Sequence, residues 1–256
     1  MWLRMAGGVS DFGLNAFTET FGILVTVLIV DHLIRRQEEL RSLPQKAAAY
    51  EDVRLLVSRI VSFWSDVYRA SVPEASPASV RELFSEPAFE KMQRFLNMDA
   101  QPNVTPATTW WDWVPRSLAD YRQRGETILE RHNNVLDPNA YGLVHQIATE
   151  GLDPNLIRSI KQSDDQMGFP RPHVLGCYWF LPGTYCDAVV GLVDWCESQF
   201  EMLGKNGVKN LKNVGKVVGP WARQERPPSM ISDDELSRQL AEVAVFKQKH
   251  AAQQPL

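Results

Sequence analysis

Cysteine is scarce in this sequence, which has three such residues, Cys177, Cys186 and Cys196. An odd number cannot pair completely within one chain, and no two of them have the CxxC spacing. The sequence therefore argues against a disulfide framework and a zinc ribbon, and it suits a reducing compartment. The motifs HExxH, GxSxG and GxxxxGK[ST] are absent too, so zinc-protease, α/β-hydrolase and P-loop chemistry have no sequence signature here.

Positive charge is not in excess either. The 256 residues include 27 Lys and Arg against 31 Asp and Glu, a net charge of −4 at pH 7, so nothing favours a nucleic-acid partner. Apolar residues make up 44% and charged residues 23% of the chain, as in an ordinary folded protein with a buried core. The one strand candidate is HVLGCYWFL, residues 173–181, which also fits a buried loop. We therefore expect an all-α fold.

The longest uncharged apolar run is FGILVTVLIV, residues 21–30. A helix of this length covers about 15 Å, roughly half of a hydrocarbon core. The wider segment 12–34 is long enough to cross, so we expect one transmembrane helix there, followed by a cytoplasmic helical bundle. Two alternatives stay open. A cleaved signal peptide lacks support because no A-x-A site follows the run, whereas a buried helix of a globular core also fits its length.

Basic residues flank this segment unevenly. Arg35, Arg36 and Arg41 follow it, whereas Arg4 is the one basic side chain before it. By the positive-inside rule, residues 1–11 form a short external N-terminus and the chain after the segment lies in the cytoplasm.

One face of the segment carries small and polar side chains. Asn15, Glu19, Gly22 and Thr26 follow the spacing i, i+4, i+7 and i+11, which places them on one helical stripe. Membrane helices associate through such residues, so we expect the segment to form a homo-oligomer along this stripe. In the alternative, Glu19 lies shallow, near the lipid headgroups.

Helices joined by short loops are expected beyond the segment. A juxtamembrane helix occupies 35–45 and breaks or kinks at Pro44. A helical cytoplasmic domain follows at 46–203, and 204–256 forms a basic segment with a C-terminal tail helix. The helix at 46–70 has an apolar stripe with three- and four-residue spacing, formed by Tyr50, Val53, Val57, Ile60, Trp64 and Val67.

Capping signals mark several helix starts. The tetrapeptide LDPN occurs at 136–139 and 152–155, and in each copy Asp is a natural N-cap and Pro a natural first helical residue. Ser76 and Pro77 mark another start in the same way. A long helix is expected to begin after Pro115.

The segment after residue 203 contains regularly spaced lysines. Lys205, Lys209, Lys212 and Lys216 fall at i, i+4, i+7 and i+11, so a helix would place them on one basic face. Such a face binds anionic membrane lipid with about 1 kcal/mol per cation near the surface. The alternative is a solvated lysine face on a tail.

Tryptophan is clustered at Trp110, Trp111 and Trp113. Tryptophan favours both cores and interfaces. Packing in the core is the first interpretation, and an exposed docking patch is the second.

Residues for catalysis are scattered. His132 lies on the apolar side of its expected helix, which favours a hydrogen-bonded core histidine, and Cys186 and Cys196 lie on an apolar face as inert packing residues. We expect no cofactor and no metal site. An enzyme would have to assemble its site from distant residues, namely Glu126, Glu130, His132, His145 and Asp164.

The order of these features resembles a loose group of small, uncharacterised bacterial single-pass membrane proteins. The resemblance rests on a span that ends in IVDHLIRRQEE, the amphipathic helix after it and the LDPN helix starts. It implies a location in the bacterial inner membrane and a helical cytoplasmic domain. It transfers no active site.

Two functional hypotheses follow. The first is a membrane-anchored interaction or effector protein that self-associates through its transmembrane helix and senses a ligand or binds a protein partner in the cytoplasm. Components of bacterial defence systems and membrane complexes share this build. The alternative is a membrane-tethered enzyme, which the sequence supports less.

Overall fold

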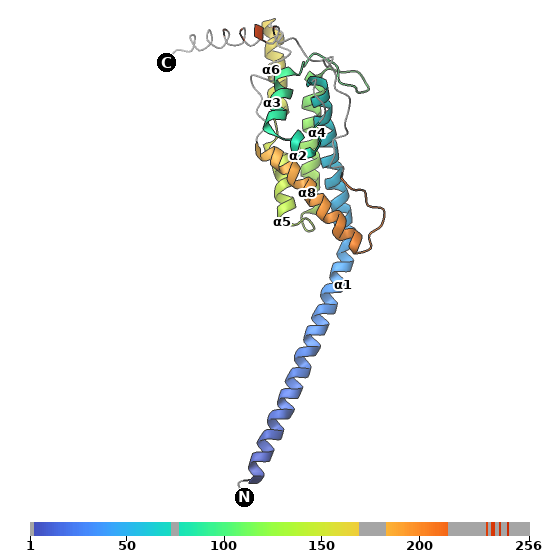
Figure 1. Ribbon diagram of the computed structural model, residues 1–256, viewed down its shortest axis with the longest axis vertical. Helices are drawn as coiled ribbons and strands as arrows, with labels where there is room; N and C mark the ends of the chain where they lie inside the picture. Colours follow the sequence, from blue (N-terminus) through green and yellow to red (C-terminus); the bar gives the residue numbers. More distant parts are fainter. Residues whose placement is uncertain are drawn as a thin grey trace, which may run out of the picture. The chain divides into compact units, whose positions relative to one another are not determined.

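The computed structural model describes residues 3–72, 77–168 and 183–214, with a few single positions between 234 and 245. Side chains are described from Thr26 onward, except for Glu39. Every regular element within these ranges is a helix (Figure 1), which confirms the predicted all-α class. The strand candidate at 173–181 lies outside the described residues. The chain divides into two units, Met1–Lys46 and Ala47–Leu256.

Helix α1 (Leu3–Ser71) contributes to both units. The expected membrane segment 12–34 is helical along its whole length. Among the side chains described, which begin at Thr26, no helix is both long and apolar enough to span a membrane. A break or kink was expected at Pro44, and the break does not occur, because α1 continues through this residue. A proline in a helix interior costs about 3 kcal/mol, and the buried turns that follow Pro44 stabilise the continued helix.

The predicted apolar stripe of α1 forms the centre of the second unit. Its helical spacing places all of its members on one face, and this face is covered completely by the neighbouring helices. Each member has 0% exposure: Tyr50, Val53, Val57, Ile60, Trp64 and Val67.

Aromatic contacts join this stripe and the adjacent Phe63 to three other helices. Trp64 packs edge-on against Phe89 of α3 (Glu86–Phe95), with ring centroids 4.8 Å apart. Phe63 meets Tyr121 of α4 (Trp110–His132) at 5.8 Å. Tyr50 lies 6.5 Å from Phe200 of α8 (Gly183–Lys205). The second half of α1 is therefore the common partner of helices distant in sequence.

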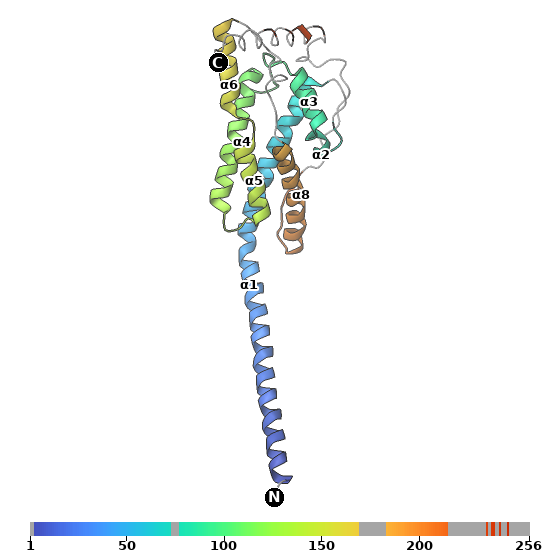
Figure 2. The same cartoon turned by 90° about the vertical axis from the view of Figure 1, so that its left-hand side faces the viewer.

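The two LDPN sequences begin helices, as predicted. Asp137 precedes α5 (Pro138–Glu150) and accepts the Ala140 amide at 3.0 Å. Asp153 precedes α6 (Pro154–Met167) and accepts the Asn155 amide at 3.0 Å. Helix α5 packs against both α4 and α8, and α6 packs against α4 (Figure 2).

Two other helix starts differ from the prediction. Helix α2 (Val80–Leu83) follows Ser79, whose side chain accepts the Glu82 amide, so Pro77 is not its first residue. Helix α4 begins at Trp110 and contains Pro115. The early start arises because the amides of Trp110 and Trp111 bond to upstream carbonyl groups and both indoles are buried.

Candidate functional site: a groove between α1 and α4

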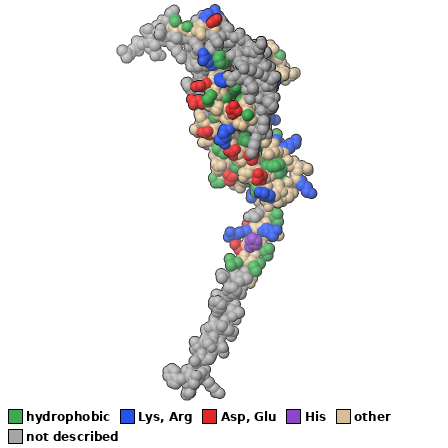
Figure 3. All heavy atoms as spheres, viewed as in Figure 1, with side chains coloured by type: hydrophobic (Ala, Val, Ile, Leu, Met, Phe, Trp, Pro, Cys, Tyr) green, Lys and Arg blue, Asp and Glu red, His purple; other side chains and the backbone are tan. Residues whose placement is uncertain are grey.

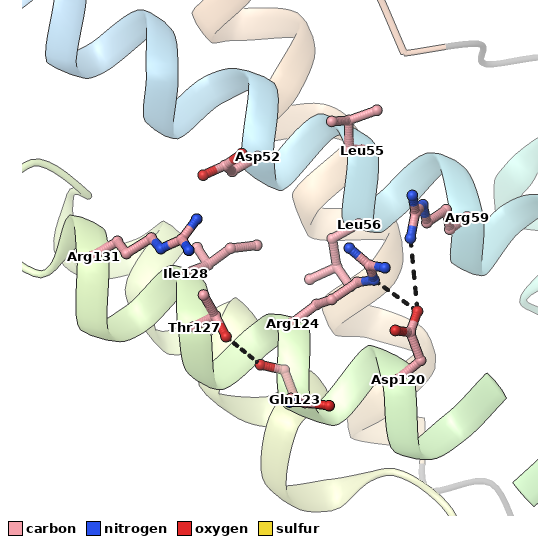
Figure 4. Close-up of a pocket in the computed structure, with 10 residues that line it drawn as sticks. All are labelled: Asp52, Leu55, Leu56, Arg59, Asp120, Gln123, Arg124, Thr127, Ile128 and Arg131. Atoms are coloured by element: carbon pink, nitrogen blue, oxygen red, sulfur yellow. Dashed lines mark hydrogen bonds and ion pairs between the residues drawn. The ribbon is translucent and has the colours of Figure 1, made fainter. Parts of the chain in front are cut away.

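A groove of about 370 Å³ lies between the second half of α1 and helix α4 (Figure 4). Its two walls use the same helical spacing of i, i+3, i+4 and i+7, which brings four side chains onto one face. Helix α1 provides Asp52, Leu55, Leu56 and Arg59. Helix α4 provides Arg124, Thr127, Ile128 and Arg131, with Asp120 and Gln123 one turn earlier.

The middle of the groove is apolar. Leu56 and Ile128 are buried, with 1% and 4% exposure, and close the groove from below. Leu55 stands at its edge and is 45% exposed, which is high for a leucine in a folded domain. The Thr127 hydroxyl donates to the Gln123 carbonyl at 2.8 Å, so its hydrogen is already used within α4.

One end of the groove holds two guanidinium groups and one carboxylate. Arg124 donates through Nε to Asp120 Oδ2 at 2.6 Å, and an Arg59 terminal nitrogen lies 3.7 Å from the same oxygen. All three side chains are between 43% and 48% exposed, so the ion pairs themselves stabilise the fold little. Two cations facing one anion leave this end with a surplus of positive charge.

The other end is electrically balanced. Asp52 Oδ2 lies 2.9 Å from His132 Nε2, which fixes the carboxylate against α4. Arg131 extends into the space beside Asp52 in Figure 4, and it makes no ion pair or hydrogen bond with any residue of the described part of the chain. The charges of Arg131 and Asp52 offset each other, so the two ends of the groove differ in net charge.

His132 matches its sequence interpretation. Its side chain is 12% exposed and bonded to Asp52, which confirms the prediction of a hydrogen-bonded histidine in the packed region. The groove was not predicted from the sequence. Each wall has side chains spaced i, i+3, i+4 and i+7, but the sequence does not show that the two walls face each other. Residues brought together there, such as Asp52 and His132, lie eighty positions apart.

The remaining residues considered for catalysis lie apart from one another. Glu126 and Glu130 are exposed on α4, and His145 is exposed on α5. Asp164 is buried on α6 with 2% exposure. Across the described ranges, no three His, Cys, Asp or Glu side chains come together as a metal site.

The two described cysteines are unreactive by environment. Burial raises the pKa of Cys186 to about 12, and the neighbouring Asp187 adds to the shift. Burial also raises the pKa of Cys196 to about 12, with Arg54 opposing this. Since the thiolate is the nucleophilic form, both behave as the predicted packing residues. Cys177 lies outside the described residues.

The lysines after residue 203 do not form a helical stripe in the described residues. Helix α8 ends at Lys205, and the chain then turns through Gly207 and Asn210, whose φ values of 84° and 64° are left-handed. Lys209 and Lys212 are exposed on the irregular segment that follows. Helical spacing was a wrong guide here, because a glycine and an asparagine end the helix. Lys216 lies outside the described residues.

The same segment returns to α1. The Tyr50 hydroxyl donates to the Lys212 carbonyl at 2.5 Å, and the Lys212 amide lies 3.4 Å from Glu51 Oε1. Val214 is buried, with 3% exposure. These contacts make residues 206–214 part of the packed unit.

The tryptophan cluster belongs mainly to the core. Trp110 and Trp111 are 1% and 5% exposed, and Trp111 Nε1 donates to Asp99 at 2.9 Å. Core packing is therefore the correct interpretation for these two indoles.

The expected helix-association stripe is described in part. The side chains of Asn15, Glu19 and Gly22 lie outside the described residues, and Thr26 is exposed.

The chain matches no known protein-family model, no curated protein and no solved structure.

Proposed function

We propose that this chain is a membrane-anchored interaction protein of the bacterial inner membrane. Residues 12–34 anchor it and join copies of it, with the N-terminus outside, and the helical unit from Ala47 onward senses a ligand or binds a partner in the cytoplasm. The observation that carries this proposal is the exposure of consecutive apolar side chains of α1.

The exposed stretch covers every side of the helix. Successive residues of an α-helix point about 100° apart, so four in a row leave no polar face. The exposed fractions are 46–61% over Val27, Leu28, Ile29, Val30, Leu33 and Ile34. Figure 3 shows apolar and basic side chains along this part of α1. An apolar surface of this kind is rarely left in contact with water. A bilayer around this part of α1 would bury it, and Arg35 and Arg36, which follow it, would lie at the cytoplasmic surface.

The anchor is tested by extraction and by reporter fusions. Full-length protein is expected to stay with membranes after alkaline carbonate washing and to need detergent for release. A cytoplasmic reporter fused after Leu256 is expected to be active, and a periplasmic one silent. Release without detergent, or the opposite reporter pattern, contradicts the proposal.

Self-association is tested on the predicted stripe. Glu19→Leu removes a carboxylate from the span and Gly22→Leu blocks close approach of two backbones, so both are expected to reduce crosslinked oligomers while insertion is kept. Single cysteines introduced at Asn15 or Thr26 are expected to crosslink, and one at Leu28 is not. Equal crosslinking on all faces contradicts the stripe.

Lipid contact by Lys205, Lys209, Lys212 and Lys216 remains part of the proposal. The three described lysines are exposed and basic, which suits anionic headgroups even without a helical face. Protection of these lysines from acetylation is expected in vesicles with anionic lipid and not in neutral vesicles, and is expected to fall as salt rises. Equal acetylation in both kinds of vesicle would mean that these lysines are solvated and do not contact lipid.

A further inference from the structure

We propose that the groove between α1 and α4 binds a small amphipathic anion, meaning a carboxylate or phosphate monoester that carries a short apolar body. This inference rests on the proposed function and deepens it, because it names the class of ligand that the helical unit senses. The argument comes from the charge at each end of the groove, the apolar surface between them and the size of the space.

The anionic group belongs at the end formed by Arg59 and Arg124. Asp120 takes one nitrogen of each guanidinium, at 3.7 and 2.6 Å. A guanidinium has five N–H donors, so both arginines keep donors for a second acceptor. A carboxylate or phosphate accepts from such groups in charge-assisted hydrogen bonds, the strongest kind available to a side chain. A neutral ligand would leave the surplus charge of this end unmatched.

The other end limits the ligand to one anionic group. Asp52 is fixed by its bond to His132 at 2.9 Å, and the charges of Asp52 and Arg131 offset each other. This end therefore has no surplus positive charge to attract a second anionic group. A molecule with acidic groups at both ends therefore fits worse than one with a single acidic group.

The apolar body belongs between the two ends. Leu56 and Ile128 form a buried floor, and Leu55 offers an exposed edge that a ligand would cover. Burying an apolar group on these side chains adds affinity in proportion to the area removed from water. The volume of about 370 Å³ lies at the lower end of small-molecule sites, which run from roughly 300 to 1,000 Å³. It is too small for a folded partner.

The binding test uses the full chain in nanodiscs of neutral lipid, titrated calorimetrically with phenyl phosphate and with inorganic phosphate. Phenyl phosphate is expected to bind at least about tenfold more tightly, because burial of its ring adds to the contacts of the phosphate. Absence of phenyl phosphate binding, or equal affinity for the two probes, overturns the proposal.

Matched variants locate the site. Arg124→Gln is expected to weaken phenyl phosphate binding about tenfold. Arg116→Gln, an exposed arginine on the same helix outside the groove, is expected to change nothing. Leu55→Ser is expected to weaken binding of phenyl phosphate and not of inorganic phosphate; since Leu55 is exposed, this variant also serves if Arg124→Gln folds poorly. Equal losses in Arg116→Gln and Arg124→Gln overturn the assignment.

A last arm separates a soluble ligand from a lipid headgroup, which share the same chemistry. Phenyl phosphate is expected to bind equally in nanodiscs with and without phosphatidylglycerol, whereas competition by this lipid overturns the assignment to a soluble anion. Membrane retention is measured separately on the same protein. If the protein stays in the membrane but phenyl phosphate does not bind in the groove, only the ligand proposal is rejected. If phenyl phosphate binds but the protein leaves the membrane without detergent, only the anchor is rejected.

Discussion

Two stretches of α1 have the same secondary structure and opposite surroundings. From Val27 to Ile34 the apolar side chains are about half exposed, whereas from Val53 to Val67 the apolar stripe has no exposure at all. The first stretch has four consecutive apolar residues, Val27–Val30, and two more after Asp31 and His32, and the second alternates apolar and polar residues with a helical period. Both stretches therefore form a helix, and the pattern of apolar residues determines whether the apolar side chains are buried within the helical unit.

The difference separates two sources of stability. The periodic stretch buries one face against α3, α4 and α8 of its own chain, and its polar face, with Asp52 and Arg59, helps to line the groove. In the first stretch, the four consecutive residues Val27–Val30 place exposed apolar side chains on every side of the helix. Under the proposed function a bilayer covers these side chains, so substitutions in the two stretches should affect different measurements.

The largest effect is expected at Trp64, which has 0% exposure and packs on Phe63 and Phe89. Trp64→Ala leaves a cavity at the centre of the helical unit and is expected to cost about 3–5 kcal/mol. Denaturant unfolding followed by near-UV circular dichroism measures this loss. The matched control Leu28→Ala, in the exposed stretch, is expected to leave this transition unchanged, and an equal loss there would break the comparison.

The next effect concerns the expected membrane segment, which contains the exposed stretch. Leu24 lies at the centre of the expected span 12–34, where an arginine costs about 2.5–3.5 kcal/mol on insertion scales. Leu24→Arg is expected to move much of the protein from the membrane to the supernatant while its helical unit unfolds as before. Leu40→Arg, beyond the span, is the control and should stay in the membrane. Equal retention of both variants would contradict a span at 12–34.

The sequence predicted local structure better than pairing. The LDPN caps and the buried stripe were predictable because each depends on residues within one or two turns. The irregular end of α8 could have been recognised from Gly207 and Asn210, but the lysine spacing pointed to a helix. Pro44 was overestimated as a helix breaker, because its cost is local and the packing that offsets it is not.

The groove could not be predicted in this way. The two sets of side chains that line it have helical spacing in the sequence, yet nothing local states that they face each other. Asp52 meets His132, and Arg59 meets Asp120, only because α1 and α4 pack together. Until that pairing is known, each charged residue has the signature of an ordinary solvated helix face.

A smaller effect is expected at the N-caps of helices α5 and α6. Asp137 accepts the Ala140 amide and also Trp195 Nε1 at 2.6 Å, whereas Asp153 accepts the Asn155 amide. Asp137→Ala should therefore cost about 2 kcal/mol, and Asp153→Ala about 1 kcal/mol. Unfolding midpoints of the two variants measure the difference, and neither should alter membrane retention. The opposite order would mean that the bond to Trp195 contributes nothing.

The smallest effect concerns Tyr50, the first residue of the buried apolar stripe of α1. Its hydroxyl donates to the Lys212 carbonyl at 2.5 Å and holds residues 206–214 on the helix. Tyr50→Phe keeps the ring and removes this bond, so at pH 8 it is expected to cost about 1 kcal/mol in the free energy of unfolding. Leu211→Ala, which leaves the hydroxyl in place, is a control for the segment itself.

The dependence of this loss on pH identifies the hydroxyl as its cause. Burial raises the pKa of Tyr50 from 10.0 to about 12, and nearby Cys196 and Glu51 add to the shift. Because the folded-state pKa is the higher one, the protonated hydroxyl stabilises the fold fully below pH 10, and its contribution is lost as the pH rises toward 12. The difference between wild type and Tyr50→Phe should therefore shrink over this interval when unfolding is measured at successive pH values. A difference that stays constant from pH 8 to 12 would contradict a titration of this hydroxyl between pH 10 and 12, and no difference at any pH would mean that the segment is held by Val214 rather than by the hydrogen bond.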